Sequence, residues 1–224
     1  MNKGDKYTLV RKRILDWYKE NKRDYPWRKS SSLYQILITE ILLQKTIALN
    51  VSNIYSAFFR KYKDFSEIYN ADTNKLQSDI KGLGLSNKRA QILKDLSQMI
   101  ITEYDGKIPQ EPEILKKING IGDYVSNAYS CFGLNNRTLF FDVNIKRFIQ
   151  RVLKPQDMKV KNDIIYTELD KLLPKMDFKD MYWAILDFGS KICSKNNPKC
   201  ELCPISDKCF YFSLPVSGKN KIRI

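Results

Sequence analysis

The sequence predicts an all-α fold, and three observations support this expectation. Apolar residues recur at helical spacing along most of the 224 residues, whereas strand signals are weak throughout. No run approaches the roughly 18 apolar residues of a membrane span. Turn-forming residues separate the helical stretches, most clearly Gly82, Gly84, Gly120, Gly122 and Asn135-Asn136. We therefore expect helices joined by tight turns, in one large domain or two small ones.

The helices can be placed in order along the chain. The first is expected over 11–19. A second is expected over 34–49, where apolar residues recur three and four positions apart: Tyr34, Leu37, Ile38, Ile41 and Leu42. Ser32 and Gln35 have the spacing of a capping box at its start. Further helices are expected over 50–62, 65–70, 73–80, 87–103, 111–118, 123–133, 143–153, 161–173 and 178–192.

The composition restricts the classes of function. A formal charge of +14 favours an anionic partner such as nucleic acid, although solubility alone could explain it. Because the chain has no histidine, Ser/His and Cys/His nucleophile pairs and histidine zinc sites are excluded. The first 20 residues carry scattered charges and no signal-peptide core. We expect a cytosolic protein, or a nuclear one if the cell has a nucleus.

Four of the five cysteines lie in one short loop, with the spacing C-x6-C-x2-C-x5-C: Cys193, Cys200, Cys203 and Cys209. Such local clustering does not suit a dispersed disulfide framework, and a cytosolic chain keeps its thiols reduced. Four thiolates suit zinc or an iron–sulfur cluster. Only Cys200 and Cys203 form a C-x2-C knuckle, so the wider spacing favours [4Fe–4S] over zinc. Cys131 is expected to be a small core residue.

A glycine turn separates two expected helices. Gly120 and Gly122 follow the helix that ends near Ile118, and the next helix starts at Asp123. Two glycines let the main chain come close to a ligand, and free N–H groups at the start of a helix favour an anion such as a DNA phosphate. The alternative is an ordinary turn between helices.

Two carboxylates stand out from the pattern. Asp142 follows the apolar segment 139–141 and directly precedes an amphipathic helix, so it is expected to be partly buried. Its alternative role is that of a helix N-cap. Glu40 lies inside an apolar helix, where an ionised group is costly to bury. Its alternative role is a structural ion pair with a lysine or arginine.

Taken together, the motifs resemble one superfamily, the helix-hairpin-helix DNA glycosylases of the endonuclease III and adenine mismatch glycosylase type. The resemblance runs from about Leu15 to Cys209. It rests on Tyr25-Pro-Trp-Arg28, Glu40-Ile-Leu-Leu-Gln44-Lys-Thr46, Gly82-Leu-Gly-Leu85, Ile118-Asn-Gly-Ile-Gly122, Asp142-Val-Asn144-Ile-Lys-Arg147 and the cysteine loop.

This resemblance implies two domains. A six-helix barrel would cover 27–137, with the helix-hairpin-helix at about 111–133. An iron–sulfur cluster domain would combine 1–26 with 138–224, with its [4Fe–4S] cluster in the loop 193–209. Double-stranded DNA with a mismatched or damaged base would bind between the domains. Independently of the resemblance, we expect a monomer, because the sequence has no long heptad pattern.

The resemblance also implies roles for single residues. Asp142 would be essential, and Asn144 would support it. Gln44 would fill the gap left by the extruded base, and Leu85 would wedge between bases near the estranged partner. Lys45, Gly120 and Gly122 would complete the DNA contacts. The cluster would organise the loop around Lys199 and Lys208 for phosphate contact.

Position 124 separates the subclasses of this superfamily. Endonuclease III-like members carry a lysine there that forms a Schiff base with the sugar, which Tyr124 cannot do. We therefore expect a monofunctional glycosylase with weak or no lyase activity. Adenine-specific members share the glutamate matched by Glu40, but they usually carry a serine at position 124. They also carry a further C-terminal domain, which we do not expect here because 224 residues leave no room for it.

Tyr124, Glu40 and Asp142 together resemble the thymine/uracil mismatch glycosylases. Asp142 would stabilise the positive charge that develops on the sugar, with Tyr124 and Glu40 beside the extruded base. The expected reaction is removal of thymine or uracil opposite guanine. One alternative is removal of adenine opposite guanine or oxidised guanine. Another is a metal-stabilised DNA-binding module without catalysis.

Overall fold

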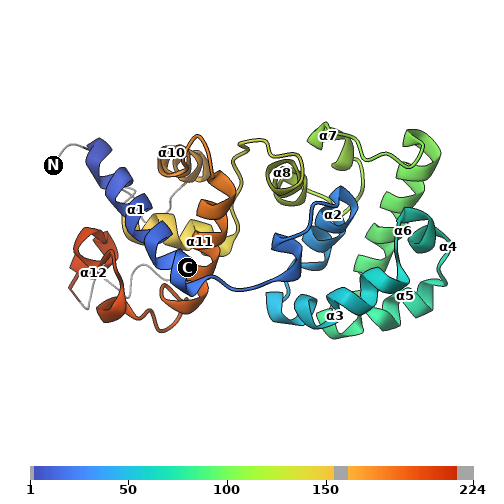
Figure 1. Cartoon of the computed structure of the whole chain (residues 1–224), viewed down its shortest axis with the longest axis horizontal. Helices are drawn as coiled ribbons and strands as arrows, with labels where there is room; N and C mark the ends of the chain where they lie inside the picture. The colour runs from blue at the N-terminus through green and yellow to red at the C-terminus, as the bar shows by residue number, and fades with distance from the viewer. Residues whose placement is uncertain (1–2, 154–160, 216–224) are drawn as a thin grey trace. The chain divides into compact units, whose positions relative to one another are not determined.

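The computed structural model describes residues 3–153 and 161–215 (Figure 1). The chain divides into two compact units: residues 1–23 with 139–224, here called unit 1, and residues 24–138, here called unit 2. Every regular element in the described part of the chain is a helix, which confirms the prediction of an all-α fold. The assignment of unit 2 as the barrel domain and of unit 1 as the cluster domain remains a prediction.

Unit 2 is built around a nearly fully buried helix, α2 (Leu33–Leu42), in which the last seven residues are buried. This helix packs against the α-helices α3 (Ala48–Lys61), α6 (Ser86–Tyr104) and α8 (Asp123–Phe132) and against a short 3-10 helix before it. The remaining helices of the unit are α4 (Phe65–Asn70), α5 (Thr73–Asp79), α7 (Pro112–Leu115) and the short 3-10 helices Pro26–Arg28 and Lys81–Leu83. The apolar residues buried by this packing supply the main driving force for folding of the unit.

The helix expected over 34–49 ends earlier than predicted, at Leu42, and α3 begins at Ala48. The cause is the main chain at Lys45, which has a φ of 52° and therefore leaves the right-handed helical region. Likewise, α7 covers only Pro112–Leu115 of the helix expected over 111–118.

The expected capping box at the start of α2 is only half formed. The Ser32 hydroxyl accepts a hydrogen bond from the Gln35 N–H at 3.3 Å. The Gln35 side chain, however, accepts hydrogen bonds from the hydroxyls of Ser30 and Tyr55, at 2.7 and 3.1 Å. The N–H of Ser32 is satisfied by the Ser30 hydroxyl instead. Ser30 thus takes the place that a returning Gln35 would fill.

Unit 1 combines the two ends of the chain. Its described α-helices are α1 (Lys3–Asn21), α9 (Val143–Leu153), α10 (Asn162–Leu172), α11 (Phe178–Lys191) and α12 (Phe210–Ser213), and short 3-10 helices cover Cys200–Leu202 and Ser206–Lys208. Helix α1 packs against α10 and α11, and α9 packs against α10, α11 and α12. An ion pair between Arg23 and Asp187 lies just after the C-terminal end of α1. The fully buried Asp187 accepts hydrogen bonds from the main-chain N–H of Arg23 at 2.8 Å and from its Nε at 2.5 Å.

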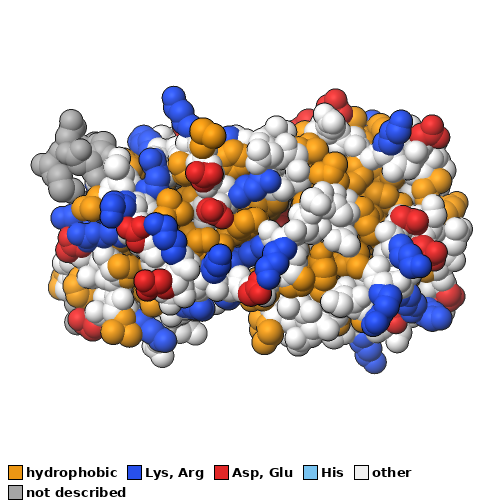
Figure 2. All heavy atoms as spheres, viewed as in Figure 1, with side chains coloured by type: hydrophobic (Ala, Val, Ile, Leu, Met, Phe, Trp, Pro, Cys, Tyr) orange, Lys and Arg blue, Asp and Glu red, His pale blue; other side chains and the backbone are white. Residues whose placement is uncertain are grey.

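The surplus of positive charge is uneven between the units. Unit 1 has 24 Lys and Arg against 13 Asp and Glu, whereas unit 2 has 15 against 12. On the face drawn in Figure 2, basic and acidic side chains are interspersed. Among the described helices, none combines the length and the apolar character that a membrane crossing needs.

Candidate active site and nucleic-acid interface

The glycine turn before α8 brings the main chain close to a neighbouring helix. Gly120 has a φ of 106°, and a Cβ atom there would lie 2.4 Å from Cδ1 of Ile92 on α6. Only glycine fits without displacing that side chain. Gly122, at the N-cap of α8, has open space around it and no side chain caps the helix. The turn therefore presents bare main chain, as close contact with a phosphate requires.

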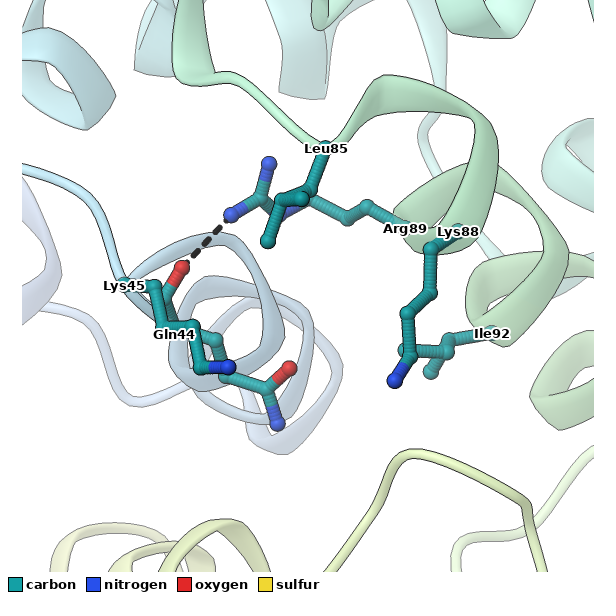
Figure 3. Close-up of a pocket in the computed structure, with 6 residues that line it drawn as sticks. All are labelled: Gln44, Lys45, Leu85, Lys88, Arg89 and Ile92. Atoms are coloured by element: carbon teal, nitrogen blue, oxygen red, sulfur yellow. Dashed lines mark hydrogen bonds between the residues drawn. The ribbon is translucent and has the colours of Figure 1, made fainter.

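Two other loops of unit 2 line a pocket next to this turn. The side-chain amide of Gln44, in the loop after α2, donates a 2.9 Å hydrogen bond to the carbonyl of Gly120. Gln44 also lines a small pocket together with Lys45, Leu85, Lys88, Arg89 and Ile92 (Figure 3). The structure thus brings together four residues that the sequence singled out for DNA contact: Gln44, Lys45, Leu85 and Gly120.

Two of the residues around this pocket have strained main-chain conformations. Lys45 and Leu85 both have a φ of 52°, in the left-handed region that non-glycine residues rarely enter. Leu85 is also 56% exposed, so an apolar side chain projects from a strained turn into solvent. Strain of this kind persists where the surrounding structure imposes it, and it is concentrated at functional sites.

Arg89 is a residue of this site that the sequence interpretation missed. It lies in the first turn of α6, is only 3% exposed, and its guanidinium donates to main-chain carbonyls of both loops. Burial lowers the pKa of this guanidinium below its ordinary value. In the sequence, one arginine among the lysines of a helix start looks like a surface residue, so no signal distinguished it.

Glu40 and Tyr124, the two pocket residues expected in unit 2, differ in exposure. Glu40 is 5% exposed, on the buried part of α2. Tyr124 is half-buried in the first turn of α8 and packs against the core of unit 2. Burying the Glu40 carboxyl group this deeply costs free energy unless the group has a specific partner.

Asp142 is the N-cap of α9, the alternative that the sequence left open. Its Oδ1 accepts the N–H groups of Asn144 at 2.9 Å and Ile145 at 2.8 Å. Its Oδ2 accepts the side-chain amide of Asn144 at 2.6 Å. A carboxylate offers about four acceptor sites, and three are used here. These hydrogen bonds fix the orientation of the half-buried carboxylate, and within the described part of the chain one acceptor site is left over.

A chain of hydrogen bonds leads from Asp142 to the cysteine loop within unit 1. The carbonyl oxygen of the Asn144 side chain accepts a 2.9 Å hydrogen bond from Arg147, which is 4% exposed. Arg147 also donates to the carbonyls of Gly189 at 2.9 Å and Cys193 at 3.0 Å. Arg147 therefore fixes both Asn144 and the first residue of the cysteine loop.

The four cysteines of the loop all line one cavity of unit 1, whose walls include Phe188 and Ile205. Arg151 secures the start of the loop by donating to the carbonyls of Ser194 at 2.6 Å and Lys195 at 2.8 Å. Its guanidinium also lies 3.6 Å from the sulfur of Cys193. Burial raises the pKa of the Cys203 thiol to about 12. A bound cation would reverse this, since metal ligation deprotonates a thiol.

The shape of the cavity bears on which group these cysteines suit. A tetrahedral zinc ion needs all its thiolates about 2.3 Å from one point. In the described part of the chain, no three cysteine or acidic side chains converge closely enough for a single metal ion. The four cysteine side chains instead line the wall of one largely apolar cavity.

The chain is similar in sequence to DNA repair proteins. Residues 38–175 match the model of the HhH-GPD superfamily of base excision DNA repair proteins. A thymine/uracil-DNA glycosylase of Methanothermobacter thermautotrophicus is 34% identical over 201 residues, covering 89% of this chain and 91% of that protein. An adenine DNA glycosylase of Mycolicibacterium smegmatis is 28% identical over 195 residues, covering 86% of this chain and 66% of that protein.

Solved structures agree with these sequence matches. A thermostable thymine-DNA glycosylase superposes with a TM-score of 0.86 at 33% identity, covering 93% of this chain and 97% of that one. Endonuclease III in a trapped covalent complex with DNA superposes with a TM-score of 0.82 at 19% identity, over the full length of both chains. At that identity, the second likeness shows the fold alone.

Proposed function

Because the chain belongs to the HhH-GPD superfamily of base excision DNA repair proteins, we propose that it removes thymine or uracil mispaired with guanine. The observation that carries this proposal is the likeness to thymine/uracil-DNA glycosylases over nine-tenths of both chains. The chain is a DNA glycosylase, and hydrolysis of the N-glycosidic bond leaves an abasic site. Such a reaction repairs deaminated cytosine and 5-methylcytosine.

Asp142 is proposed as the catalytic carboxylate. Cleavage of the base–sugar bond places positive charge on the sugar, and a carboxylate near C1′ stabilises this charge. The three hydrogen bonds on Asp142 fix its position before the substrate arrives. No reorganisation is then needed during the reaction, which is the usual source of electrostatic catalysis. The remaining lone pair can orient the attacking water.

Glu40 and Tyr124 are proposed to serve the extruded base. The buried Glu40 carboxylate can accept the N3–H of thymine or uracil. The Tyr124 ring offers a flat face for the pyrimidine. Because Tyr124 has no amine, a Schiff base with C1′ cannot form at this position, so we propose little or no lyase activity.

The four cysteines are proposed to hold a [4Fe–4S] cluster: Cys193, Cys200, Cys203 and Cys209. The apolar cavity that they line and their wide spacing support this assignment. When bound, the cluster would crosslink the loop 193–209. Lys199 and Lys208 on that loop would contact phosphates, consistent with the excess of basic residues in unit 1. Hydrolysis itself needs no redox step.

Double-stranded DNA is the proposed partner, and Gln44, Lys45, Leu85, Gly120 and Gly122 are proposed to contact it. Gln44 would fill the gap in the base stack and Leu85 would wedge beside the estranged base. We propose action as a monomer at the nucleoid, or in the nucleus if the cell has one.

Excision assays on three duplexes test the proposal. Duplexes with a central G·T, G·U or A·G pair are incubated with the protein and cleaved with alkali at abasic sites. We expect cleavage at G·T and G·U. Cleavage at A·G alone would instead support adenine removal, which the match to adenine DNA glycosylases makes the second candidate.

The aspartate variant Asp142→Asn tests catalysis against simple binding. We expect it to lose excision while retaining DNA affinity. Asp72→Asn is the matched control. Asp72 is also a helix N-cap and accepts the Lys75 N–H at 2.8 Å, but it caps α5 and has no proposed role in catalysis. If the wild type excises nothing, or Asp142→Asn excises as fast as the wild type, the DNA-binding module becomes the better reading.

A further inference from the structure

The Arg89 guanidinium joins two loops of unit 2 at matching points. Its Nη2 donates to the carbonyl of Gln44 at 2.6 Å (Figure 3), and its Nη1 donates to the carbonyl of Gly84. Each of these carbonyls belongs to the peptide that enters a left-handed residue: Lys45 after Gln44, and Leu85 after Gly84. One side chain therefore holds both strained turns at the same position in each turn.

The hydrogen bonds from Arg89 oppose the strain of the two left-handed turns. A non-glycine residue in the left-handed region is strained, so the two turns would relax unless something opposed them. Hydrogen bonds from a charged donor are about twice as strong as neutral ones. Arg89 also donates to the carbonyl of Ile41 at 3.4 Å, at the C-terminus of α2, where the helix dipole favours a cation.

The turn of α6 that carries Arg89 also contacts the glycine turn at Gly120. Ile92, three residues after Arg89 on the same face of α6, is the side chain that Gly120 accommodates. Gln44 donates to the carbonyl of Gly120 from the other side. All three loops that the proposed function assigns to DNA are thus tied to one turn of α6.

We infer that Arg89 is a positioning residue that makes the loops of Gln44 and Leu85 one rigid insert for the base stack. This inference rests on the proposed function and adds the residue that prepares the insert. Extruding a base breaks its stacking and pairing, and side chains that fill the gap offset this cost best if they are already in place. Arg89 would lower the cost of extrusion without touching the reacting atoms.

Two variants separate positioning from bulk packing. Arg89→Met keeps a long apolar stem but removes every donor, and Arg89→Lys keeps one compact charge without the planar fork. In single-turnover excision from a G·U duplex, we expect about a tenfold loss for Arg89→Met and a smaller loss for Arg89→Lys. The loss should shrink to less than about threefold when uracil lies opposite an abasic analogue, because less stacking and pairing must then be broken.

Two further readouts report the insert directly. With 2-aminopurine beside the target uracil, Arg89→Met should show a smaller fluorescence increase on binding than the wild type. Amide hydrogen exchange should accelerate in residues 43–47 and 82–86, while the middle of α2 and α6 keeps wild-type protection. Arg60→Met, at an exposed position near the end of α3, is the matched control and should change none of these.

The outcomes are distinguishable. Equal losses on both duplexes, or unchanged exchange in the two loops, would overturn the inference. If Arg89→Met does not fold, Arg89→Lys decides by the same two measurements. A wild type that excises neither substrate would refute the proposed function, whereas hydrogen exchange would still decide the role of Arg89.

Discussion

The side-chain amide of Asn144 donates a 2.6 Å hydrogen bond to Oδ2 of Asp142, while Oδ1 of the same aspartate caps helix α9. Asn144 is itself held by the buried Arg147. Capping and catalysis are therefore compatible uses of one carboxylate, since the cap occupies one oxygen and Asn144 orients the other.

This relationship predicts the effect of Asn144→Ala. The variant should excise uracil from a G·U duplex about tenfold more slowly at saturating enzyme, because Oδ2 loses its orienting donor. DNA affinity should stay within about twofold, since Asn144 is not proposed to contact DNA. Single-turnover rates and a binding titration measure the two effects. Asn53→Ala, at an exposed position of α3, is the control, and an equal loss in both variants would argue against the orienting role.

Gly120→Ala should destabilise unit 2 by about 1–3 kcal/mol, because the new Cβ would meet Ile92 and the left-handed φ is strained for alanine. Urea unfolding measures the change. Gly82→Ala, where a Cβ meets no atom within 4 Å, should change stability far less. In an Ile92→Ala background, Gly120→Ala should lower the free energy of unfolding by less, because only the conformational part of the loss remains. An equal loss in both backgrounds would mean that the contact with Ile92 is not the cause.

Tyr124→Lys should acquire Schiff-base chemistry if the side chain at position 124 faces C1′. Incubation with a G·U duplex and borohydride should then yield a covalent protein–DNA adduct on a denaturing gel. The wild type should give little adduct. The double variant Lys117→Arg/Tyr124→Lys controls for adducts formed by the exposed Lys117, in the turn before α8. Absence of an adduct from an active variant would place position 124 away from the sugar.

The purified protein should be yellow-brown, with a broad visible absorbance band from its cluster. Cys203→Ser should lose most of the iron and sulfide, because one of four proposed ligands is missing. Cys131→Ala, a buried cysteine of unit 2 outside the loop, should retain both. Metal analysis alongside the spectrum checks this. A colourless protein loaded with zinc would contradict the cluster assignment.

Tyr129→Phe should flatten the alkaline end of the stability profile. Burial raises the pKa of Tyr129 to about 12, from an ordinary value of 10.0. Its stabilising effect is therefore complete below pH 10 and is lost as the pH rises towards 12. The hydroxyl has no hydrogen-bond partner in the described part of the chain, so its removal should cost little at pH 7. Urea midpoints at pH 7 and pH 11 test this, with the more exposed Tyr69→Phe as control.

Local patterns predicted most of the helices. The helices 65–70 and 143–153 were found with the expected bounds, because each has a clear start signal and a regular apolar face. The family suggested by the motifs is also confirmed. Such features depend on residues close together in the sequence.

Features that depend on distant contacts were not predictable. The helix expected over 34–49 contains no glycine or proline, so nothing local indicated that Lys45 would turn left-handed. That turn is held by Arg89, 45 residues from the Gln44 carbonyl that it binds. The roles of Asp142, Glu40 and Tyr124 remain predictions, and they await the measurements above.

The ion pair between Arg23 and Asp187 has a consequence for synthesis on the ribosome. Its partners are 164 residues apart, and α1 packs against α10 and α11, which are made only after the whole of unit 2. Unit 2 is a continuous segment and can fold while the chain is still growing. Helix α1 is made before unit 2 but must wait for α11 to emerge, so its apolar face stays exposed to chaperones or misassociation while the intervening residues are made.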